Sequence, residues 1–226
     1  MQKLLTIAES CFADVNLNIN LSKCAAMRIG NNCKSDCCDL KLSNGLISWR
    51  HELKYLGVVF GHASYLKVNL HHNKVKFFRA FNGIYAKIGG SNSVDTIVYL
   101  MKSKCLSVLL FNLEAVDISK TDLNNLKFPV FRSFMKIFNV KSKENVDWCR
   151  YYMNMLSVEY LVDAKKFKFY NKLATSECFL LRHLYSHAAL DHCNAIRRKF
   201  GITNDNMTYN NFVFILWQKT HNDLLY

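Results

Sequence analysis

The chain has 226 residues, of which 50% are hydrophobic and 13% aromatic, and this composition excludes the intrinsically disordered class. Its 30 Lys and Arg residues outnumber 17 Asp and Glu residues and leave a formal net charge of +13, which favours a polyanionic partner such as nucleic acid. Nine scattered cysteines argue against a disulfide scaffold, and the lack of a bilayer-length apolar run argues against a membrane protein. We therefore expect an intracellular protein, cytoplasmic or nuclear.

The first 30 residues are predicted to begin with a helix. Apolar residues recur at helical spacing from Leu4 to Val15. Polar and apolar residues then alternate from Asn16 to Asn20, which predicts a short strand or an extended entry to the next segment. The segment from Cys24 to Ile29 is predicted to be a second strand that ends at a turn containing Gly30.

A hairpin is predicted after a polar loop. The segment from Cys33 to Asp39 is polar and loop-like. The pair Asn44-Gly45 lies between two short apolar segments, Leu40 to Leu42 and Leu46 to Trp49, and Asn-Gly is the strongest two-residue turn signal. We therefore expect two antiparallel strands with Asn44-Gly45 as their turn.

The stretch from Leu53 to Phe60 separates two kinds of sequence. It is apolar, β-branched and aromatic and is followed by Gly61, which predicts a buried strand. Gly57 inside it indicates a bulge or a close approach of another backbone. Before this stretch the sequence predicts short strands and turns, and after it the sequence predicts mainly helices.

A long basic helix is predicted after Gly61. Apolar residues fall on one face at 3.6-residue spacing from Leu66 to Ile88. A solvated helix face normally mixes charges, so a surface of one sign favours contact with phosphates, and an ordinary solvated face is the alternative. From Gly61 to Gly90 there is no acidic residue, and the basic residues are Lys67, Lys74, Lys76, Arg79 and Lys87.

The second half is predicted to be a series of amphipathic helices. Residues 89–92 are expected to break the helical pattern, and Ser93 is expected to cap the next helix. A helix is predicted from near Asp117 to Phe128, and Pro129 is expected to end it. Further helices are predicted near residues 146–154, 158–173, 177–200, with a break near Ser186, and 210–225.

Three more basic clusters follow the first. The second is again free of acidic residues, as a phosphate-facing surface would be. The clusters are Lys127, Arg132, Lys136, Lys141 and Lys143, then Lys165, Lys166, Lys168 and Lys172, then Arg197-Arg198-Lys199.

The sequence contains two groups of potential metal ligands, but neither predicts a metal site. Cys33, Cys37 and Cys38 are too few for a structural zinc site, which needs four ligands, so free thiols are favoured. His183 and His187 are one helical turn apart, but the sequence between them lacks the Glu of a zinc-protease motif.

The order of motifs in the first 90 residues resembles metazoan non-LTR retrotransposon reverse transcriptases. The motifs are Leu-x-Ile-Asn-x-x-Lys at residues 17–23, a strand with Met27, a glycine-containing hairpin, Lys-Tyr-Leu-Gly-Val at residues 54–58, and Phe-Phe-Arg-Ala-x-Asn at residues 77–82. The resemblance begins after the active-site strand of the palm and runs into the helical thumb.

The resemblance implies a role for each matching position. Lys23 would be the palm lysine near the incoming nucleotide. Tyr55, Leu56 and Gly57 would form the primer grip, where a glycine permits close backbone approach. The helical thumb would contact an RNA–DNA or DNA duplex through Lys67, Lys74, Lys76, Arg79, Lys87, Arg132 and Lys136.

The sequence departs from this family at the metal site. The family enzymes hold Mg²⁺ on palm carboxylates for phosphoryl transfer. Their Ala-Asp-Asp strand is not in this sequence, and residues 12–15, Phe-Ala-Asp-Val, lack the second aspartate and fall on a helical stripe. We therefore expect no polymerase activity from this chain alone, and we expect the missing N-terminal half of such a polymerase as a further partner.

Together these patterns predict an α+β chain with two parts. Residues 1–60 are expected to be a palm remnant, and residues 61–226 a helical thumb and connection region. The expected function is primer–template binding by a fragment of an RNA-directed DNA polymerase. The alternative is a non-enzymatic basic helical module that binds RNA or an acidic protein partner, and salt dependence separates the two because counterion release accompanies duplex binding.

Overall fold

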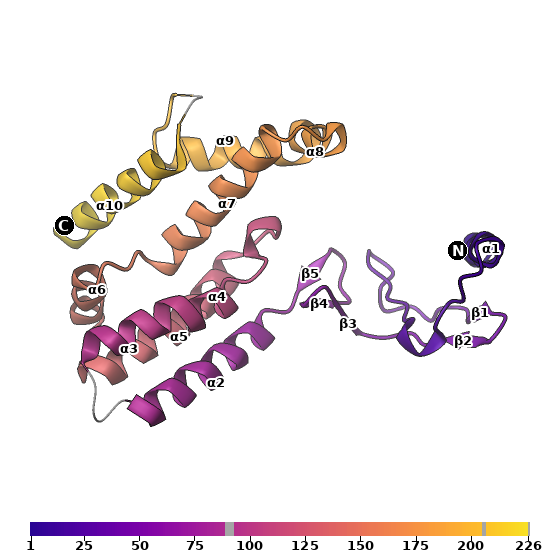
Figure 1. Cartoon of the computed structure of the whole chain (residues 1–226), viewed down its shortest axis with the longest axis horizontal. Helices are drawn as coiled ribbons and strands as arrows, with labels where there is room; N and C mark the ends of the chain where they lie inside the picture. The colour runs from indigo at the N-terminus through magenta and orange to yellow at the C-terminus, as the bar shows by residue number, and fades with distance from the viewer. Residues whose placement is uncertain (89–92, 205–206, 226) are drawn as a thin grey trace. The chain divides into compact units, whose positions relative to one another are not determined.

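The computed structural model describes residues 1–88, 93–204 and 207–225. The chain divides into two compact units, Met1–Asn69 and Leu70–Tyr226, which we call the N-terminal unit and the helical unit (Figure 1). Helices combined with two small antiparallel sheets confirm the α+β class. The boundary follows Asn69, whereas the expected one followed residue 60, and the identities of the two parts as palm and thumb stay predictions.

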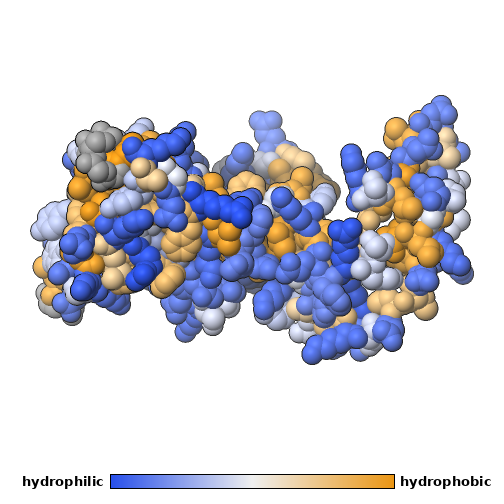
Figure 2. Space-filling view, turned by 90° about the horizontal axis from the view of Figure 1, so that it is seen from below, coloured by the Kyte–Doolittle hydropathy of each residue, from blue (hydrophilic) through white to orange (hydrophobic). Residues whose placement is uncertain are grey.

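The first helix of the N-terminal unit forms as predicted. Helix α1 spans Gln2–Asp14, but none of its residues is buried. Several large apolar side chains of the unit are therefore exposed, and Figure 2 shows apolar atoms at its surface, on the right of the view. Among them are Leu4, Ile7, Phe12, Val15 and Leu17.

Residues 17–20 form no strand, and the extended backbone of Asn20 agrees with the alternative of an extended entry, whereas the strand predicted from Cys24 to Ile29 is wrong. Leu21–Lys23 is a 3₁₀ turn, because the Asn20 side chain accepts a hydrogen bond from the Ser22 backbone N–H at 3.0 Å. Such side-chain capture of the backbone competes with strand pairing. Farther on, Ala26 makes only an isolated parallel bridge with Trp49.

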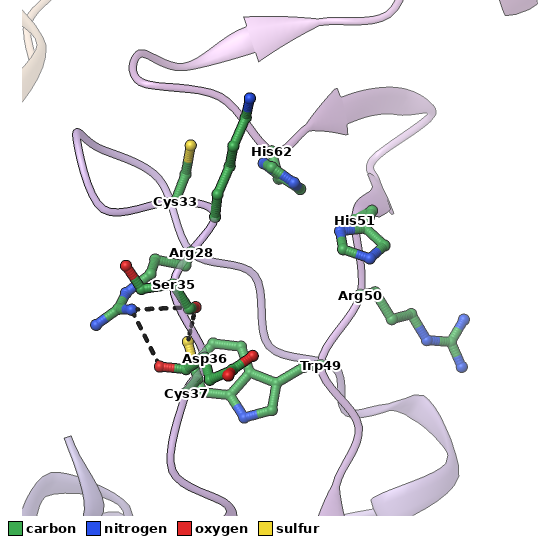
Figure 3. A pocket seen from close by; sticks show the side chains of 10 residues that line it. Arg28, Cys33, Ser35, Asp36, Cys37, Trp49, Arg50, His51 and His62 are labelled. Carbon is green, nitrogen blue, oxygen red and sulfur yellow. Dashed lines mark hydrogen bonds between the residues drawn. The ribbon is translucent and has the colours of Figure 1, made fainter.

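The predicted loop after Ile29 is confirmed and is organised by one arginine. The Arg28 guanidinium donates hydrogen bonds to the backbone carbonyls of Asn32, Ser35 and Asp36 at 3.3 to 3.5 Å, and Figure 3 shows those to Ser35 and Asp36. Because one side chain gathers three carbonyls, the loop folds back on itself without regular secondary structure.

The first hairpin is confirmed, but its turn differs from the prediction. Strands β1 (Leu40–Leu42) and β2 (Gly45–Ile47) pair with Leu42 opposite Gly45, so Ser43-Asn44 is the turn. The Ser43 backbone N–H donates to the Glu9 carboxylate at 2.8 Å, which holds Ser43 out of the strand. Gly45 has a φ of +143°, and a Cβ there would lie 2.6 Å from Leu21, so both its backbone conformation and close packing require a glycine.

The predicted single strand from Leu53 to Phe60 is instead a tight hairpin. Strand β3 (Glu52–Tyr55) pairs with β4 (Val58–Gly61), and Leu56-Gly57 is the two-residue turn between them. Both turn residues have positive φ, +46° at Leu56 and +85° at Gly57, as the twist of a two-residue hairpin favours. An apolar run interrupted by one glycine is thus divided between two strands.

The long helix begins later than predicted. Lys67 lies in strand β5 (Lys67–Val68), which pairs with β4, and helix α2 spans His71–Ile88. Lys67 is not on the helix, because its backbone is paired with that of Gly61. The predicted apolar stripe is confirmed in its centre, where Phe77 and Phe81 are buried.

The first layer of the helical unit packs around these phenylalanines. Helix α3 (Val94–Leu100) begins at the predicted Ser93 cap and continues through a π-helical segment, Met101–Cys105, into α4 (Leu106–Leu109). A short 3₁₀ turn, Leu113–Ala115, follows. The expected break at residues 89–92 lies outside the described residues.

The expectation that Pro129 ends a helix is wrong. Helix α5 runs without interruption over Lys120–Phe138 with Pro129 inside it. A proline costs about 3 kcal/mol in a helix interior, and burial of several side chains at about 1.5–3 kcal/mol each offsets that cost. Leu126, Val130 and Phe134 supply this buried face.

The remaining helices agree with the predictions. Within the helical unit, Figure 1 shows α7 running beside α9 and α10, and the buried Phe167 and Phe212 rings of α7 and α10 meet at 4.3 Å. The predicted break near Ser186 is a π-helical segment. The segments are α6 (Lys143–Tyr152), α7 (Val158–Ala174), α8 (Phe179–Leu184), the π-helix Tyr185–Ala189, α9 (Leu190–Lys199) and α10 (Tyr209–Leu225). In the ranges that the structure describes, none of these helices combines the length and apolarity that a bilayer crossing requires.

Candidate nucleic-acid interface

Helices α2 and α5 enclose a basic groove in the helical unit. The two helices pack against each other, and a groove of about 430 Å³ lies along their contact. Phe78, Phe81 and Asn82 line it from α2. From α5 and the segment after it, the lining residues are Arg132, Ser133, Met135, Lys136, Asn139, Val140 and Lys141.

The cations of α5 share one face. Arg132 and Lys136 are four residues apart, which places their side chains one helical turn apart on the same side. Both are exposed. The Lys136 amino group lies 4.4 Å from the centre of the Tyr85 ring of α2, so an aromatic ring orients this cation without neutralising it.

The groove cations have no acidic partner among the described residues. In contrast, the Lys165 amino group lies 3.6 Å from the Glu114 carboxylate, and the Lys166 amino group lies 4.0 Å from the Asp117 carboxylate. The structure therefore separates cations that hold the fold together from cations that remain available to a ligand. Sequence analysis alone grouped all of them as basic clusters.

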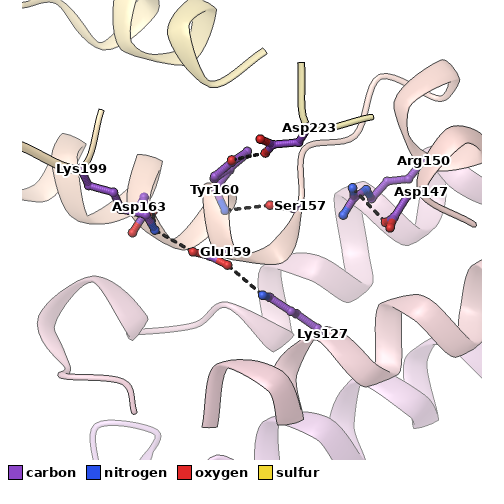
Figure 4. Close-up of polar contacts among 9 residues, drawn as sticks. All are labelled: Lys127, Asp147, Arg150, Ser157, Glu159, Tyr160, Asp163, Lys199 and Asp223. Atoms are coloured by element: carbon purple, nitrogen blue, oxygen red, sulfur yellow. Dashed lines mark hydrogen bonds and ion pairs between the residues drawn. The ribbon is translucent and has the colours of Figure 1, made fainter. Parts of the chain in front are cut away.

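Glu159 of α7 is the centre of the strongest structural ion-pair network. It accepts hydrogen bonds from Lys127 of α5 at 2.8 Å and from Lys199 of α9 at 2.7 Å, and Lys199 also donates to Asp163 at 2.8 Å (Figure 4). Burial raises the pKa of Glu159, but the hydrogen bonds from Lys127 and Lys199 outweigh this and lower the pKa to about 2. Lys127 and Lys199 therefore connect helices and are not free for nucleic acid.

The predicted cations of α2 lie on different sides of the helix. With about 100° per residue, Lys74 lies on the same side as Phe78, toward the groove. Lys76 and Lys87 lie on the opposite side, and Arg79 lies beside them, directly opposite the buried face of the helix. Lys76, Arg79 and Lys87 are exposed, and Lys74 is half-buried. The α2 cations therefore form two strips, and none of them lines the groove, whose cations come from α5 and the segment after it.

The residues matched to the primer grip form the tip of the β3–β4 hairpin. Tyr55 is 62% exposed and Leu56 is 75% exposed, so two large apolar side chains project from the N-terminal unit. Gly57 completes the turn with positive φ. Lys23 and Lys67 are also exposed residues of this unit, at the end of the 3₁₀ turn and in β5.

The residues present do not fit a magnesium site. Asp14 is a single exposed carboxylate at the end of α1. Over residues 1–88, 93–204 and 207–225, no group of three or more His, Cys, Asp or Glu side chains is arranged to hold a metal ion. No catalytic step is therefore assigned to these residues.

The sequence did not indicate Phe78 as a groove residue or Tyr85 as a neighbour of Lys136, whereas Phe81 belongs to the predicted apolar stripe. Phe78 and Tyr85 are seven residues apart on α2 and form a second stripe beside the buried one. That spacing was a usable signal, but which helix would face this stripe depended on the packing of α2 against α5.

Comparison with protein-family models, with curated proteins and with solved structures finds no match to this chain.

Proposed function

We propose that this protein binds the phosphate backbone of a nucleic-acid duplex along the α2–α5 groove. The observation that carries the proposal is the packing of two acid-free stretches against each other, with exposed cations that have no acidic partner among the described residues. Phosphates are the partners that such unpaired Lys and Arg side chains bind most readily, because binding releases condensed counterions.

The chemistry of the groove suits a backbone contact without base reading. Arg132 can donate to one phosphate through its planar guanidinium, while Lys136 offers a point charge one turn farther along. Phe78 and Met135 add apolar surface beside these cations, which suits contact with sugars. Binding of this kind is independent of base sequence.

The finer proposal is that the duplex is the RNA–DNA or DNA primer–template of a non-LTR reverse transcriptase. The order of motifs in the first 90 residues supports it, and so does the exposed apolar tip formed by Tyr55, Leu56 and Gly57, which suits contact with a primer end. On this proposal the chain contributes primer–template binding to an RNA-directed DNA polymerase, with Lys23 as its palm lysine.

A salt titration with matched variants tests the duplex proposal. Binding of the full chain to a short RNA–DNA duplex is followed by fluorescence anisotropy at several salt concentrations. The double variant Arg132→Gln, Lys136→Gln should bind more weakly, and the magnitude of its log–log salt slope should fall by roughly 1–2, near 0.9 for each lost phosphate contact.

The control removes the same charge elsewhere. Lys168→Gln, Lys172→Gln alters two exposed lysines of α7 outside the groove, and its salt slope should equal that of the unmodified chain. Equal losses in both double variants would mean that only net charge matters and would contradict the groove. Salt-independent behaviour would instead favour the alternative of a protein-binding module, whose interface buries apolar surface.

A further inference from the structure

The N-terminal unit contains a cavity that the duplex proposal does not use. Its volume is about 650 Å³, within the range of roughly 300–1,000 Å³ typical of small-molecule sites. The loop after Arg28 forms one wall, and the segment Trp49–His51 and His62 form the other (Figure 3).

Hydrogen bonds hold both walls in place. The Arg28 guanidinium fixes the loop through its bonds to three backbone carbonyls. The Trp49 indole N–H donates to the Cys38 carbonyl at 3.2 Å, and the His62 backbone N–H donates to the His51 carbonyl at 2.8 Å. The cavity is therefore formed before any ligand arrives, which lowers the entropic cost of binding.

The lining carries an excess of positive charge. Lys34 and Arg50 are exposed and make no ion pair within the described part of the chain. Asp36 is the single carboxylate of the lining, against three cationic side chains when Arg28 is included. An anionic group is therefore the ligand that this lining favours.

Two histidines add hydrogen-bonding groups that can bind an anion. The rings of His51 and His62 lie opposite each other, with centroids 4.9 Å apart (Figure 3). The His62 Nδ1 atom is buried and has no hydrogen-bond partner among the described residues. An imidazole ring offers an N–H that can donate to an anionic oxygen.

Trp49 offers an aromatic surface at the same cavity. It is 37% exposed, and the bond to Cys38 fixes the orientation of its ring. A ring that is held in place and partly open to solvent is suited to stacking with a nucleobase.

We propose that this cavity binds a nucleotide. The phosphate lies at Lys34 and the two histidines, and the base stacks on Trp49. An anionic group and a flat ring in one ligand match the two kinds of surface that the cavity brings together. All lining residues belong to the N-terminal unit and the duplex groove belongs to the helical unit, so each proposal can fail without the other.

Nuclear magnetic resonance of the indole N–H groups tests this proposal on the full chain. The sequence has three tryptophans, and Trp49→Phe identifies the Trp49 signal. Adenosine monophosphate should shift that signal and leave the signals of Trp148 and Trp217 unchanged. Adenosine has the base without the phosphate, and inorganic phosphate has the anion without the base, so both should bind more weakly than adenosine monophosphate.

Two further variants connect the shift to the cavity. Lys34→Gln should weaken adenosine monophosphate binding roughly fivefold through loss of one charge-assisted bond. Lys41→Gln, which removes the same charge from an exposed residue of β1 outside the cavity, should not change it. Trp49→Leu should weaken binding more than Trp49→Phe, because phenylalanine keeps a stacking surface.

Several outcomes would overturn the proposal. One is the absence of a Trp49 shift at about 10 mM adenosine monophosphate, a concentration at which millimolar affinities are visible. The others are an equal shift with inorganic phosphate alone, and equal losses of affinity in Lys34→Gln and Lys41→Gln.

A single-stranded oligonucleotide, tested on the Arg132→Gln, Lys136→Gln chain, distinguishes a free nucleotide from a nucleotide that belongs to a strand. If the oligonucleotide binds more tightly than adenosine monophosphate, the ligand is a nucleotide within a strand. If it binds equally or more weakly, the ligand is a free nucleotide.

Discussion

The Tyr85 hydroxyl donates a hydrogen bond to the backbone carbonyl of Lys136 at 3.4 Å, and the Lys136 amino group lies over the Tyr85 ring at 4.4 Å. One residue of α2 thus contacts both the backbone and the charged group of one residue of α5. This relationship holds the two helices of the groove together and orients a cation that has no carboxylate partner among the described residues.

Replacement of Tyr85 should therefore affect duplex binding through Lys136. Tyr85→Leu removes the ring and should weaken binding roughly two- to fivefold, the equivalent of an exposed cation–π contact. Tyr85→Phe keeps the ring and should bind nearly as well as the unmodified chain. Anisotropy titrations at one salt concentration compare the three proteins. Equal affinity of Tyr85→Leu and the unmodified chain would remove Tyr85 from the interface.

The turn of the β3–β4 hairpin should be strained at Leu56. Leu56 has φ of +46°, a conformation that costs about 1–2 kcal/mol for most residues and less for asparagine. Leu56→Asn should therefore stabilise the hairpin by roughly 1 kcal/mol, since Asn-Gly is the preferred pair in such turns. Hydrogen exchange of the β3 and β4 amides measures the gain.

The matched control for the turn is Leu46→Asn. Leu46 is also an exposed leucine, but it lies in strand β2 and not at a position of positive φ. The same substitution there should be neutral or destabilising, because asparagine is unfavourable in strands. Slower exchange in both variants would show that removal of an exposed leucine, rather than relief of strain, causes the effect.

The Glu159 network should make the helical unit sensitive to acid. Hydrogen bonds from Lys127 and Lys199 lower the pKa of Glu159 to about 2 despite its burial, from an ordinary value of 4.5. A carboxylate with a lowered pKa contributes stability above its unfolded pKa and loses it as the pH falls through its folded pKa. Thermal unfolding should therefore move to lower temperature as the pH falls from about 4.5 to about 2.

Glu159→Gln should remove most of this acid dependence. The side chain is partly exposed, so solvent screening limits the loss at neutral pH to about 1 kcal/mol. Glu177→Gln, at an exposed position outside the network, is the control and should keep the acid dependence of the unmodified chain. An unchanged pH profile in Glu159→Gln would place the acid sensitivity elsewhere.

The N-terminal unit should be the first part of the chain that a protease attacks. The buried residues of its described core cluster are Leu40, Leu42 and Ile47, and α1 contributes none. The sheet formed by β1 and β2 has two strands, and such a sheet is marginally stable alone. Brief trypsin digestion should cut at Lys3, Lys23 or Lys34 before the helices α5 and α7, and mass spectrometry identifies the fragments. Survival of residues 1–69 while α5 or α7 is cut would contradict this prediction.

The fold class and most helices could be predicted from the sequence, because helical periodicity and caps are local signals. The Ser93 cap is an example, whereas the break predicted near Ser186 is a π-helical segment between α8 and α9. The hairpin turns and the end of a helix at Pro129 were predicted wrongly, because each depends on contacts distant in sequence. Ser43 leaves its strand for Glu9, and α5 continues through Pro129 because its neighbours are buried.

For the candidate site, the sequence by itself determined the excess of positive charge and the two acid-free stretches. Only the tertiary structure decided which cations are available. Lys127 and Lys136 belong to the same basic stretch, yet one is bound to Glu159 of α7 and the other lies over Tyr85 of α2. Ion pairing depends on distances of a few ångströms between helices, and spacing along a chain does not determine which helices meet.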